Sequence, residues 1–370
     1  MTIQVDPVSD RSGRRQFLEF PYTKYRGHPH WIPPLRLLEA ARFTPGKYPF
    51  YEHAEVELFL AREGSIVVGR IAAIDDALHR ETHAENLAAF GYFEAESEAA
   101  AVALLGAVEA WAHARGREIV RGPLNPSLND SAGLLIDAFD RDPMLMMPYN
   151  PSEYARFLEH AGYRKIKDLL AWTIALPWSD DHPAVRTIAR FRGRLDVTIR
   201  TFDRRGIERE LERFHEIYCR AWSRNWGFVP PTAAESRQLV SDLKHLIDPT
   251  LVLRADVAGV PVGCAVAVPD LNQVLKGTDG RLFPRGWIRW LARKRLMTQV
   301  RLLLLGVIPE YRQGLVYGLL VTELLKRAGS RYRRAEFSWV LEDNSDINNA
   351  AASIGARRDK TYRVYQKEIR

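Results

Sequence analysis

The spacing of hydrophobic residues among polar ones changes several times along the first 176 residues. Alternation with a period of two is typical of strands, whereas apolar residues at spacings of three and four are typical of helices. These patterns predict strands at residues 55–62, 65–74, 90–94, 118–121 and 169–176. They predict helices at residues 16–25, 97–115 and 154–161. A loop-rich stretch, residues 122–150, lies between the fourth strand and the third helix.

The same succession of elements begins again after residues 177–183, a Pro-Trp-Ser-Asp-Asp-His-Pro stretch that has breakers and charges but no apolar period. Strands are predicted at residues 197–202, 250–255, 260–268, 300–307, 335–341 and 361–368. Helices are predicted at residues 207–222, 233–247, 315–328 and 345–353. The repeated order indicates an α/β protein with two tandem domains, residues 1–178 and residues 179–370.

The composition agrees with two globular domains in a reducing compartment. Of the 370 residues, 46% are hydrophobic and 27% are charged, which supplies enough apolar side chains for two cores. No apolar run approaches the roughly 20 residues that a transmembrane helix needs. The first 15 residues lack the apolar segment of a signal peptide. Cys219 and Cys264 lie among apolar neighbours, as small core residues do. We therefore expect a cytoplasmic protein.

The segment most indicative of a mechanism lies in the second half, where a predicted strand ends at residues 307–309. Residues 310–314, Glu-Tyr-Arg-Gln-Gly, then lead to a helix that begins near Leu315. The first turn of a helix attracts phosphate through its unpaired N–H groups and the helix dipole. Arg312 adds a positive charge at that end. The pattern predicts a site for a diphosphate.

Around this segment the sequence resembles the GNAT superfamily of acyl-CoA-dependent N-acyltransferases. The resemblance is carried by Gly-Val-Ile-Pro-Glu-Tyr-Arg at residues 306–312, by Ser-Trp-Val-Leu-Glu-Asp-Asn at residues 338–344, and by Gly355. Motifs at residues 49–55, 122–127 and 147–151 resemble a subgroup of bacterial tandem-GNAT proteins. The resemblance implies two tandem GNAT-like domains, each a mixed, mostly antiparallel central sheet flanked by helices, of which the first is degenerate.

The resemblance further implies that acetyl-CoA or a longer acyl-CoA is the cosubstrate, and that an amine attacks its thioester directly. The implied CoA-binding residues are Val307, Ile308, Arg312, Gln313, Gly314, Leu315, Val316, Tyr317 and Asn344. The chain departs from the family pattern at Leu315 and Tyr317, where small residues are expected, and at Ala351, where many members have a tyrosine that protonates the thiolate. These departures motivate an alternative, a non-catalytic regulatory protein that binds CoA or a small molecule on the same scaffold.

Acyl transfer to an amine also needs a base. Asp270 follows one predicted core strand and Glu342 ends another, so both are candidates. Carboxylates at strand ends also form turns and caps, and Asp343 and Asn344 suit a helix cap directly. The ten histidines are dispersed along the chain, so no metal site is expected.

Candidates for the substrate pocket come from both halves of the chain. Two tryptophans lie between helices of the second half, where either an apolar lid or a helix–helix junction would place them. Polar loops of the first half suit either a polar small molecule or purely local turns. The candidates are Trp222, Trp226, Asn272, Asn125, Asn129, Tyr149 and Asn150.

An insertion at residues 277–299 is rich in arginine and tryptophan. Arg285, Arg289 and Arg293 are four apart, which predicts that they line one face of a helix whose remainder is apolar. The chain's net charge is +7, and the run that starts at Arg281 and ends at Arg301 contains no acidic residue. Such a surface suits an anionic membrane or an acyl carrier protein, and no nucleic-acid-binding motif accompanies it. The alternative is a surface helix that packs its tryptophans on the core.

Overall fold

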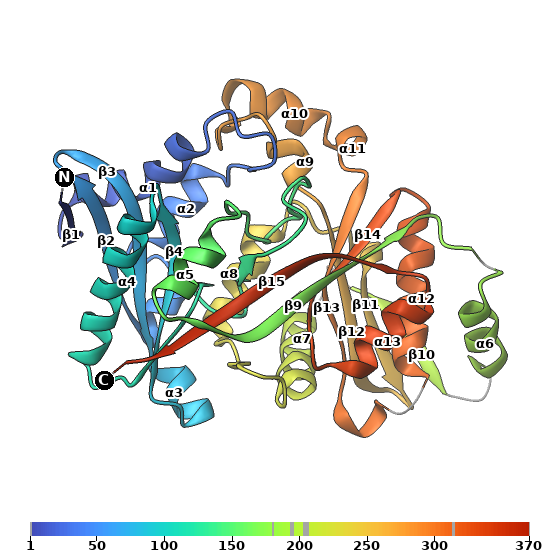
Figure 1. Ribbon diagram of the computed structural model, residues 1–370. Helices are drawn as coiled ribbons and strands as arrows, with labels where there is room; N and C mark the ends of the chain where they lie inside the picture. The colour runs from blue at the N-terminus through green and yellow to red at the C-terminus, as the bar shows by residue number, and fades with distance from the viewer. Residues whose placement is uncertain (1, 180, 193–195, 203–206, 313–314, 370) are drawn as a thin grey trace. The chain divides into compact units, whose positions relative to one another are not determined.

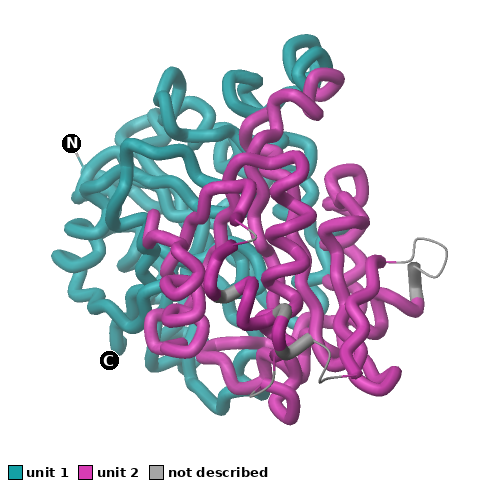
Figure 2. Tube along the Cα trace, turned by 90° about the vertical axis from the view of Figure 1, so that its right-hand side faces the viewer, with its two compact units in different colours: residues 1–169, 275–289, 360–370 teal, residues 170–274, 290–359 magenta. Residues whose placement is uncertain are grey.

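The computed structural model describes residues 2–179, 181–192, 196–202, 207–312 and 315–369. The chain divides into two units that are not simple halves of the sequence (Figure 2). Unit 1 comprises Met1–Leu169, Leu275–Arg289 and Lys360–Arg370, and unit 2 comprises Leu170–Val274 and Trp290–Asp359. These boundaries differ from the predicted division after residue 178, because each unit includes a strand segment from the other half of the sequence.

The sheet of unit 1 has the strand order β1-β2-β3-β4-β5-β15. Its pairs are antiparallel except for β4 and β5, which are parallel. The strands are β1 (Ile3–Pro7), β2 (Ala54–Glu63), β3 (Ile66–Asp76), β4 (Leu87–Ala95), β5 (Ile119–Gly122) and β15 (Arg357–Glu368). Three short strands lie in the loop-rich stretch: β6 (Leu124–Asn125), β7 (Ser131–Ala132) and β8 (Leu134–Leu135).

Helices α1 (Arg11–Lys24) and α4 (Glu98–His113) pack against this sheet (Figure 1). Unit 1 also contains α2 (Arg36–Arg42), α3 (Ala77–His83) and α5 (Tyr154–His160), with a 3₁₀ turn η1 (Pro49–Glu52). Helix α4 begins where the Ser97 hydroxyl accepts a hydrogen bond from the Ala100 backbone N–H at 3.2 Å. Its buried alanine and leucine side chains pack on β1–β4, because the spacing of these residues places them on one helix face.

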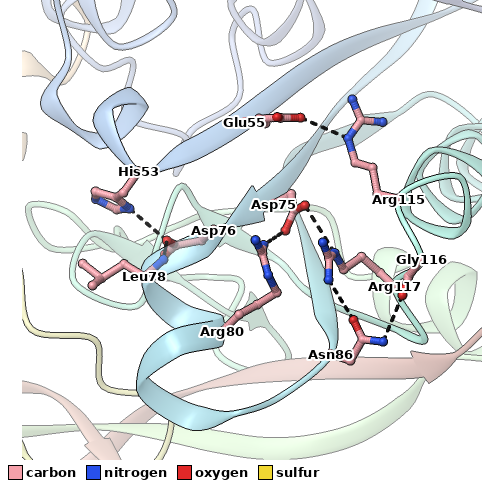
Figure 3. A network of polar contacts seen from close by, with 10 residues as sticks. All are labelled: His53, Glu55, Asp75, Asp76, Leu78, Arg80, Asn86, Arg115, Gly116 and Arg117. Atoms are coloured by element: carbon pink, nitrogen blue, oxygen red, sulfur yellow. Dashed lines mark hydrogen bonds and ion pairs between the residues drawn. The ribbon is translucent and has the colours of Figure 1, made fainter.

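A polar network ties together the end of β3, helix α3 and the chain before β5 (Figure 3). The buried Asp75 carboxylate accepts hydrogen bonds from Arg80 and, at 3.3 Å, from Arg117. Arg117 also donates to the Asn86 side chain at 2.9 Å, and Asn86 donates to the Gly116 carbonyl at 2.9 Å. Because each partner is held by a second contact, we assign this network to structure rather than to a ligand site.

The sheet of unit 2 has the order β9-β14-β13-β12-β11-β10. The pairs from β10 to β13 are antiparallel, and β13 and β14 are parallel. The strands are β9 (Arg164–Ala175), of which the last six residues belong to this unit, β10 (Val197–Thr201), β11 (Val252–Val257), β12 (Val260–Pro269), β13 (Gln299–Val307) and β14 (Arg334–Leu341).

Helices lie on both faces of the unit 2 sheet. They are α6 (Pro183–Arg192), α7 (Ile207–Trp222), α8 (Ala233–Leu243), α9 (Asn272–Leu275), α12 (Val316–Gly329) and α13 (Ser345–Ser353), with 3₁₀ turns η3 (Pro249–Leu251) and η5 (Pro309–Tyr311). A Cβ atom at Gly263 would contact Leu320 of α12, and one at Gly306 would contact Trp222 of α7. Gly306 is paired with Cys264, the residue after Gly263, so α12 and α7 cover opposite faces.

The insertion lies between β12 and β13, but it is not one helix. It contains an irregular helical turn η4 (Leu282–Gly286), then α10 (Trp287–Leu291) and α11 (Arg293–Leu296). The prediction that Arg285, Arg289 and Arg293 line a single helical face was therefore wrong, because the three residues lie in η4, α10 and α11 respectively, and the chain departs from helical geometry at Ala292. Within the described ranges, no helix combines the length and apolar character that crossing a bilayer requires.

Candidate functional site

A cavity of about 450 Å³ opens in unit 2 where strands β13 and β14 part. The two strands pair over four residues only, from Gln299 opposite Arg334 to Leu302 opposite Phe337. Beyond that point residues 303–307 and 338–341 form the two sides of the cavity. The β14-facing edge of β13 is thus presented to the cavity, and its backbone groups are placed to pair with an extended ligand as with an added strand.

A β-bulge in β13 lies at the point where the strands part. Leu302 is opposite Ala267 on β12, and Leu304 is opposite Val266, so Leu303 is the extra residue. A bulge bends its strand and increases the local twist. It therefore turns the second half of β13 away from β14 while the pairing with β12 continues to Val307.

The end of helix α7 forms the wall opposite the strand edge. Trp222 lines the cavity and lies against Gly306, where a Cβ atom would be 2.2 Å from a carbon of the indole ring. Only glycine allows this contact without moving the helix or the strand. Asn225, just after α7, also lines the cavity, whereas Trp226 is not among its described lining residues. The structure thus places one of the two predicted tryptophans at the site.

The predicted diphosphate end of the cavity lies at the start of helix α12. Arg312, Leu315 and Tyr317 line the cavity there. No side chain caps α12 at Leu315, so its first N–H groups lack a side-chain acceptor from the capping position. The Arg312 guanidinium donates to the carbonyls of Val307, at 3.2 Å, and Ala221. These bonds fix the guanidinium beside the helix start without neutralising its charge.

The other cofactor-binding predictions have different outcomes. Val307 lines the cavity, while Ile308 and Val316 are buried in the core of unit 2. Gln313 and Gly314 lie outside the described residues. The phenol of Tyr317 is packed closely enough that burial raises its pKa well above the ordinary value. Both bulky residues of the loop, Leu315 and Tyr317, therefore form part of the wall of the cavity and do not close it.

Helix α13 provides the remaining side of the cavity. Asn344 lines the cavity and caps the helix, since its side-chain oxygen accepts a hydrogen bond from the Ile347 N–H at 3.3 Å. Asp346, in the first turn of α13, is the single acidic side chain among the described lining residues. Ala350 also lines the cavity, but Ala351 is buried in the core. The position at which the resemblance implies a tyrosine thus supplies only a methyl group.

We expect the Asn344→Ala variant to lose about 1 kcal/mol of unfolding free energy, because the first turn of α13 loses its cap. Chemical denaturation measures this change. Asn349→Ala is the matched control, since Asn349 is exposed in the interior of the same helix and its replacement should be neutral or slightly stabilising. Equal destabilisation by both substitutions would contradict the capping role.

A buried arginine, Arg301, contacts a residue that lines the cavity, whereas the sequence analysis counted it only as part of the basic run. Arg301 is opposite Glu336 in the β13–β14 ladder, and the two side chains are 3% and 0% exposed. The Arg301 guanidinium donates to the Ser338 hydroxyl at 2.9 Å and to the Ser338 carbonyl at 3.0 Å. Ser338 itself lines the cavity. The detectable signal was a single charged residue inside each of the predicted strands 300–307 and 335–341, which are otherwise mainly apolar.

This placement corrects the prediction for the basic run. Arg301 was its last member, yet the side chain is buried in β13 and cannot contribute to a membrane- or protein-binding surface.

The two predicted catalytic carboxylates, Asp270 and Glu342, are not among the described residues that line the cavity. Asp270 is 3% exposed, and its carboxylate accepts a hydrogen bond from the Asn272 N–H at 3.2 Å at the start of α9. Its own N–H donates to the carbonyl of Gln299, the first residue of β13. With a rise of about 3.3 Å per residue, that end of β13 is about 13 Å from Leu303. The placement favours the turn-forming interpretation of Asp270. Asn272, a predicted substrate-pocket residue, begins α9 and is not among the described residues that line the cavity.

The polar candidates of the first half are distributed over unit 1. Asn125 accepts a hydrogen bond from the Tyr92 N–H at 2.5 Å, and the Asn129 N–H donates to Ser127 within a turn. Asn150 is buried and bonds the backbone of Leu135 in both directions. These three residues hold loops of unit 1 in place, but only the Asn129 contact is the local turn that the alternative described.

Tyr149 is different, because it lines a cavity of about 580 Å³ that is open to solvent. Its hydroxyl donates to the Phe139 carbonyl at 2.9 Å. His28 lines the same cavity and is oriented by its Nδ1, which accepts hydrogen bonds from the N–H groups of His30 and Trp31. No cluster of three or more potential metal ligands occurs in the part of the chain for which coordinates are described.

The sequence is similar to two curated proteins over almost its whole length, although no protein-family model matches it. It is 34% identical over 368 residues to protein YghO of Escherichia coli, covering 97% of this chain and 94% of that protein. It is 34% identical over 380 residues to the bacterial ceramide synthase of Caulobacter vibrioides, covering 99% of this chain and 98% of that protein.

Solved structures show the same architecture at low sequence identity. A tandem GNAT protein of the clavulanic acid biosynthesis pathway superposes with a TM-score of 0.58 at 13% identity, covering 100% of this chain and 99% of that chain. A probable N-acyltransferase from Enterococcus faecalis gives a TM-score of 0.55 at 10% identity, covering 100% of this chain and 73% of that chain. These similarities confirm the predicted tandem GNAT fold.

Proposed function

This chain belongs to the family that includes the bacterial ceramide synthase of Caulobacter vibrioides and YghO of Escherichia coli, and we propose that it transfers an acyl group from acyl-CoA to the amine of a long-chain base. A ceramide is the amide of a fatty acid and such a base. The observation that carries the proposal is the cavity between β13 and β14, which has one charged end, an exposed strand edge and an apolar interior.

The cavity offers each part of an acyl-CoA a suitable surface. Arg312 and the start of α12 suit the diphosphate, because a fixed guanidinium and unpaired helical N–H groups both favour negative charge. The edge of β13 at residues 303–307 suits the amide-containing arm of CoA, which would pair with it as a strand does. Leucine side chains at 302, 303 and 305 suit an acyl chain.

The reaction we propose is a direct attack. The free amine nitrogen attacks the thioester carbonyl carbon, the C–S bond breaks, and the electron pair leaves with the sulfur as a thiolate that is then protonated. Backbone N–H groups at the bulge of β13 are positioned to stabilise the developing oxyanion. A base takes the amine proton, and we assign that role to Asp346, which faces the cavity.

We expect Asp346→Asn to lower kcat by about 100-fold, which is typical for loss of a general base. Asp270→Asn and Glu342→Gln are the matched controls, since neither residue lines the cavity among the described positions, and their kcat should stay within about twofold of wild type. Steady-state thiol release measures all three. Loss of turnover in Asp270→Asn with full turnover in Asp346→Asn would reverse the assignment.

The central experiment incubates the protein with palmitoyl-CoA and sphinganine, and measures CoA release together with the mass of the amide product. We expect stoichiometric CoA and N-acyl base. Octylamine and a polar amine such as spermidine test whether the acceptor is long-chain. Turnover with spermidine but not with the long-chain amines would support acyl transfer and reject a long-chain base as the acceptor. If no acyl-CoA binds in calorimetry, the whole proposal is rejected.

A non-catalytic CoA-binding protein is the second candidate, and specific residues favour it. Leu315 and Tyr317 are bulky residues at the diphosphate end, and Ala351 offers no proton to a leaving thiolate. This candidate predicts that acyl-CoA binds and raises Tm while no amine releases CoA. The calorimetric and turnover measurements above therefore separate the two functions.

A further inference from the structure

Large apolar side chains are exposed at an unusual density in two stretches of unit 1. Ten such residues are exposed in the described chain, and six of them fall within residues 37–38 and 282–288 of unit 1. They are Leu37, Leu38, Leu282, Phe283, Trp287 and Ile288. Phe283 is 73% exposed and Ile288 is 67% exposed. Single exposed apolar residues are ordinary, but a concentration of this kind marks an interaction site.

The two stretches are joined by a fixed anchor. The Arg36 N–H donates to the Gly280 carbonyl at 3.1 Å, and the Arg36 guanidinium donates to both Asp279 carboxylate oxygens at 3.1 Å. The same guanidinium lies over the Tyr22 ring at 3.7 Å. Leu37 directly follows Arg36, and the exposed turn begins directly after Gly280. The two exposed stretches therefore begin next to each other in unit 1.

The exposed rings are already arranged on the surface. Phe283 and Trp287 are stacked, with ring centroids 5.8 Å apart and an interplanar angle of 8°. The backbone turn beneath them is tight, since a Cβ atom at Gly286 would be 2.4 Å from the Arg281 carbonyl oxygen. Aromatic rings of this kind favour the headgroup region of a bilayer, where an apolar face and a polar edge are both accommodated.

The charged residues within residues 280–296 have one sign, although Asp279, just before them, pairs with Arg36 and, at 3.7 Å, with Arg281. From Gly280 to Leu296 the sequence contains no acidic residue, and it contains Arg281, Arg285, Arg289, Arg293, Lys294 and Arg295. The whole chain has a net charge of +7, so this short stretch accounts for most of the excess. Arg281 and Arg285 flank the stacked rings and are exposed. Apolar side chains bordered by cations are typical of segments that lie in the interface of an anionic membrane.

We propose that Leu37, Leu38 and residues 281–289 of unit 1 form a docking surface for an anionic phospholipid bilayer. The apolar residues enter the headgroup boundary while the arginines contact lipid phosphates. An acidic carrier protein would satisfy the arginines but would not account for six exposed Leu, Ile, Phe and Trp side chains. The proposal is independent of the acyl-transfer proposal, because it requires no bound acyl-CoA.

The test is co-sedimentation of the full chain with vesicles of phosphatidylcholine alone or mixed with phosphatidylglycerol. We expect binding that depends on phosphatidylglycerol and weakens with salt. Phe283→Ser with Ile288→Ser should weaken binding by about tenfold or more, and Arg281→Glu with Arg285→Glu should remove the preference for phosphatidylglycerol. Ile66→Ser with Val260→Ser is the matched control, because these two apolar residues are exposed elsewhere.

A readout from Trp287 makes the test independent of sedimentation. Vesicles should shift the tryptophan emission to the blue, and the shift should diminish in Trp287→Phe. Thermal melting checks that each variant is folded. Wild-type binding by the Phe283→Ser, Ile288→Ser variant overturns the proposal. The proposal is also overturned if the protein binds no vesicles but is retained on immobilised acyl carrier protein, and the same substitutions abolish that retention.

Discussion

Replacing Gly306 by valine should reduce kcat/KM by about 100-fold or more while leaving a folded protein. A Cβ atom at this position would be 2.2 Å from the Trp222 ring, so the strand edge or the end of α7 must move. Both form walls of the cavity, and a displacement of about 1 Å in a positioning wall costs about 100-fold in rate. The measurement is CoA release at low substrate concentration, with Tm recorded for each variant.

The Trp222→Ala background provides the matched control. Without the indole ring, a valine at residue 306 meets open space on that side, although the Ala221 methyl remains 3.0 Å from the Cβ position. In this background we therefore expect Gly306→Val to lower kcat/KM by less than about threefold, whatever the effect of Trp222→Ala alone on kcat/KM. Equal losses in both backgrounds would show that the steric contact with Trp222 is not the cause.

Replacing Arg301 by leucine should lower the free energy of unfolding by about 3 kcal/mol. The substitution removes charge-assisted hydrogen bonds to the Ser338 hydroxyl and carbonyl, and it leaves Glu336 buried opposite an apolar residue. Urea denaturation measures the change. Because Ser338 lines the cavity, catalysis should fall as well, even at temperatures where the variant is fully folded.

Two further variants isolate the cause of this effect. Arg285→Leu removes an exposed arginine and should change stability by no more than about 0.5 kcal/mol. Ser338→Ala removes one acceptor but keeps the bond from Arg301 to the backbone, so we expect an intermediate loss of about 1 kcal/mol. If Arg301→Leu were no more destabilising than Arg285→Leu, the buried guanidinium would have no structural role.

Local pattern was sufficient for most elements of the fold. Helix α7 was predicted at residues 207–222 and α13 at residues 345–353, and both agree with the observed bounds. In each case apolar residues at helical spacing define the buried face, and Asn344 marks the start of α13. Strand β1 and helix α3 were missed, because their short sequences carry polar residues at positions that only the packed structure covers.

Long-range pairing could not be predicted in the same way. Alternation at residues 361–368 indicated a strand, but it gave no information on which sheet that strand joins. In the structure its end pairs with β5 of unit 1, from Tyr365 opposite Gly122 to Glu368 opposite Ile119. Pairing partners depend on contacts between residues far apart in the chain, which period alone does not encode.

The difference between local pattern and long-range pairing also explains which predicted site residues line the cavity and which do not. Arg312, Leu315, Tyr317 and Asn344 follow from a contiguous strand–turn–helix pattern, and all four line the cavity. Asp270 was placed at the site because it ends a strand, but β12 runs antiparallel to β13, so its end meets the start of β13. Only the direction of pairing shows that this is the wrong end of the sheet.

The exchange of strand segments between the two units constrains how the polypeptide can mature. Unit 1 needs the part of β15 that begins at Lys360, so its sheet stays incomplete until ribosomal synthesis has passed both units in the sequence. Unit 2 needs Leu170 onward, so cutting the gene near codon 178 removes a segment from each product. Each unit thus needs segments from both halves of the sequence. Fusing either half to another protein at residues 177–183 would remove a strand segment from the unit it carries.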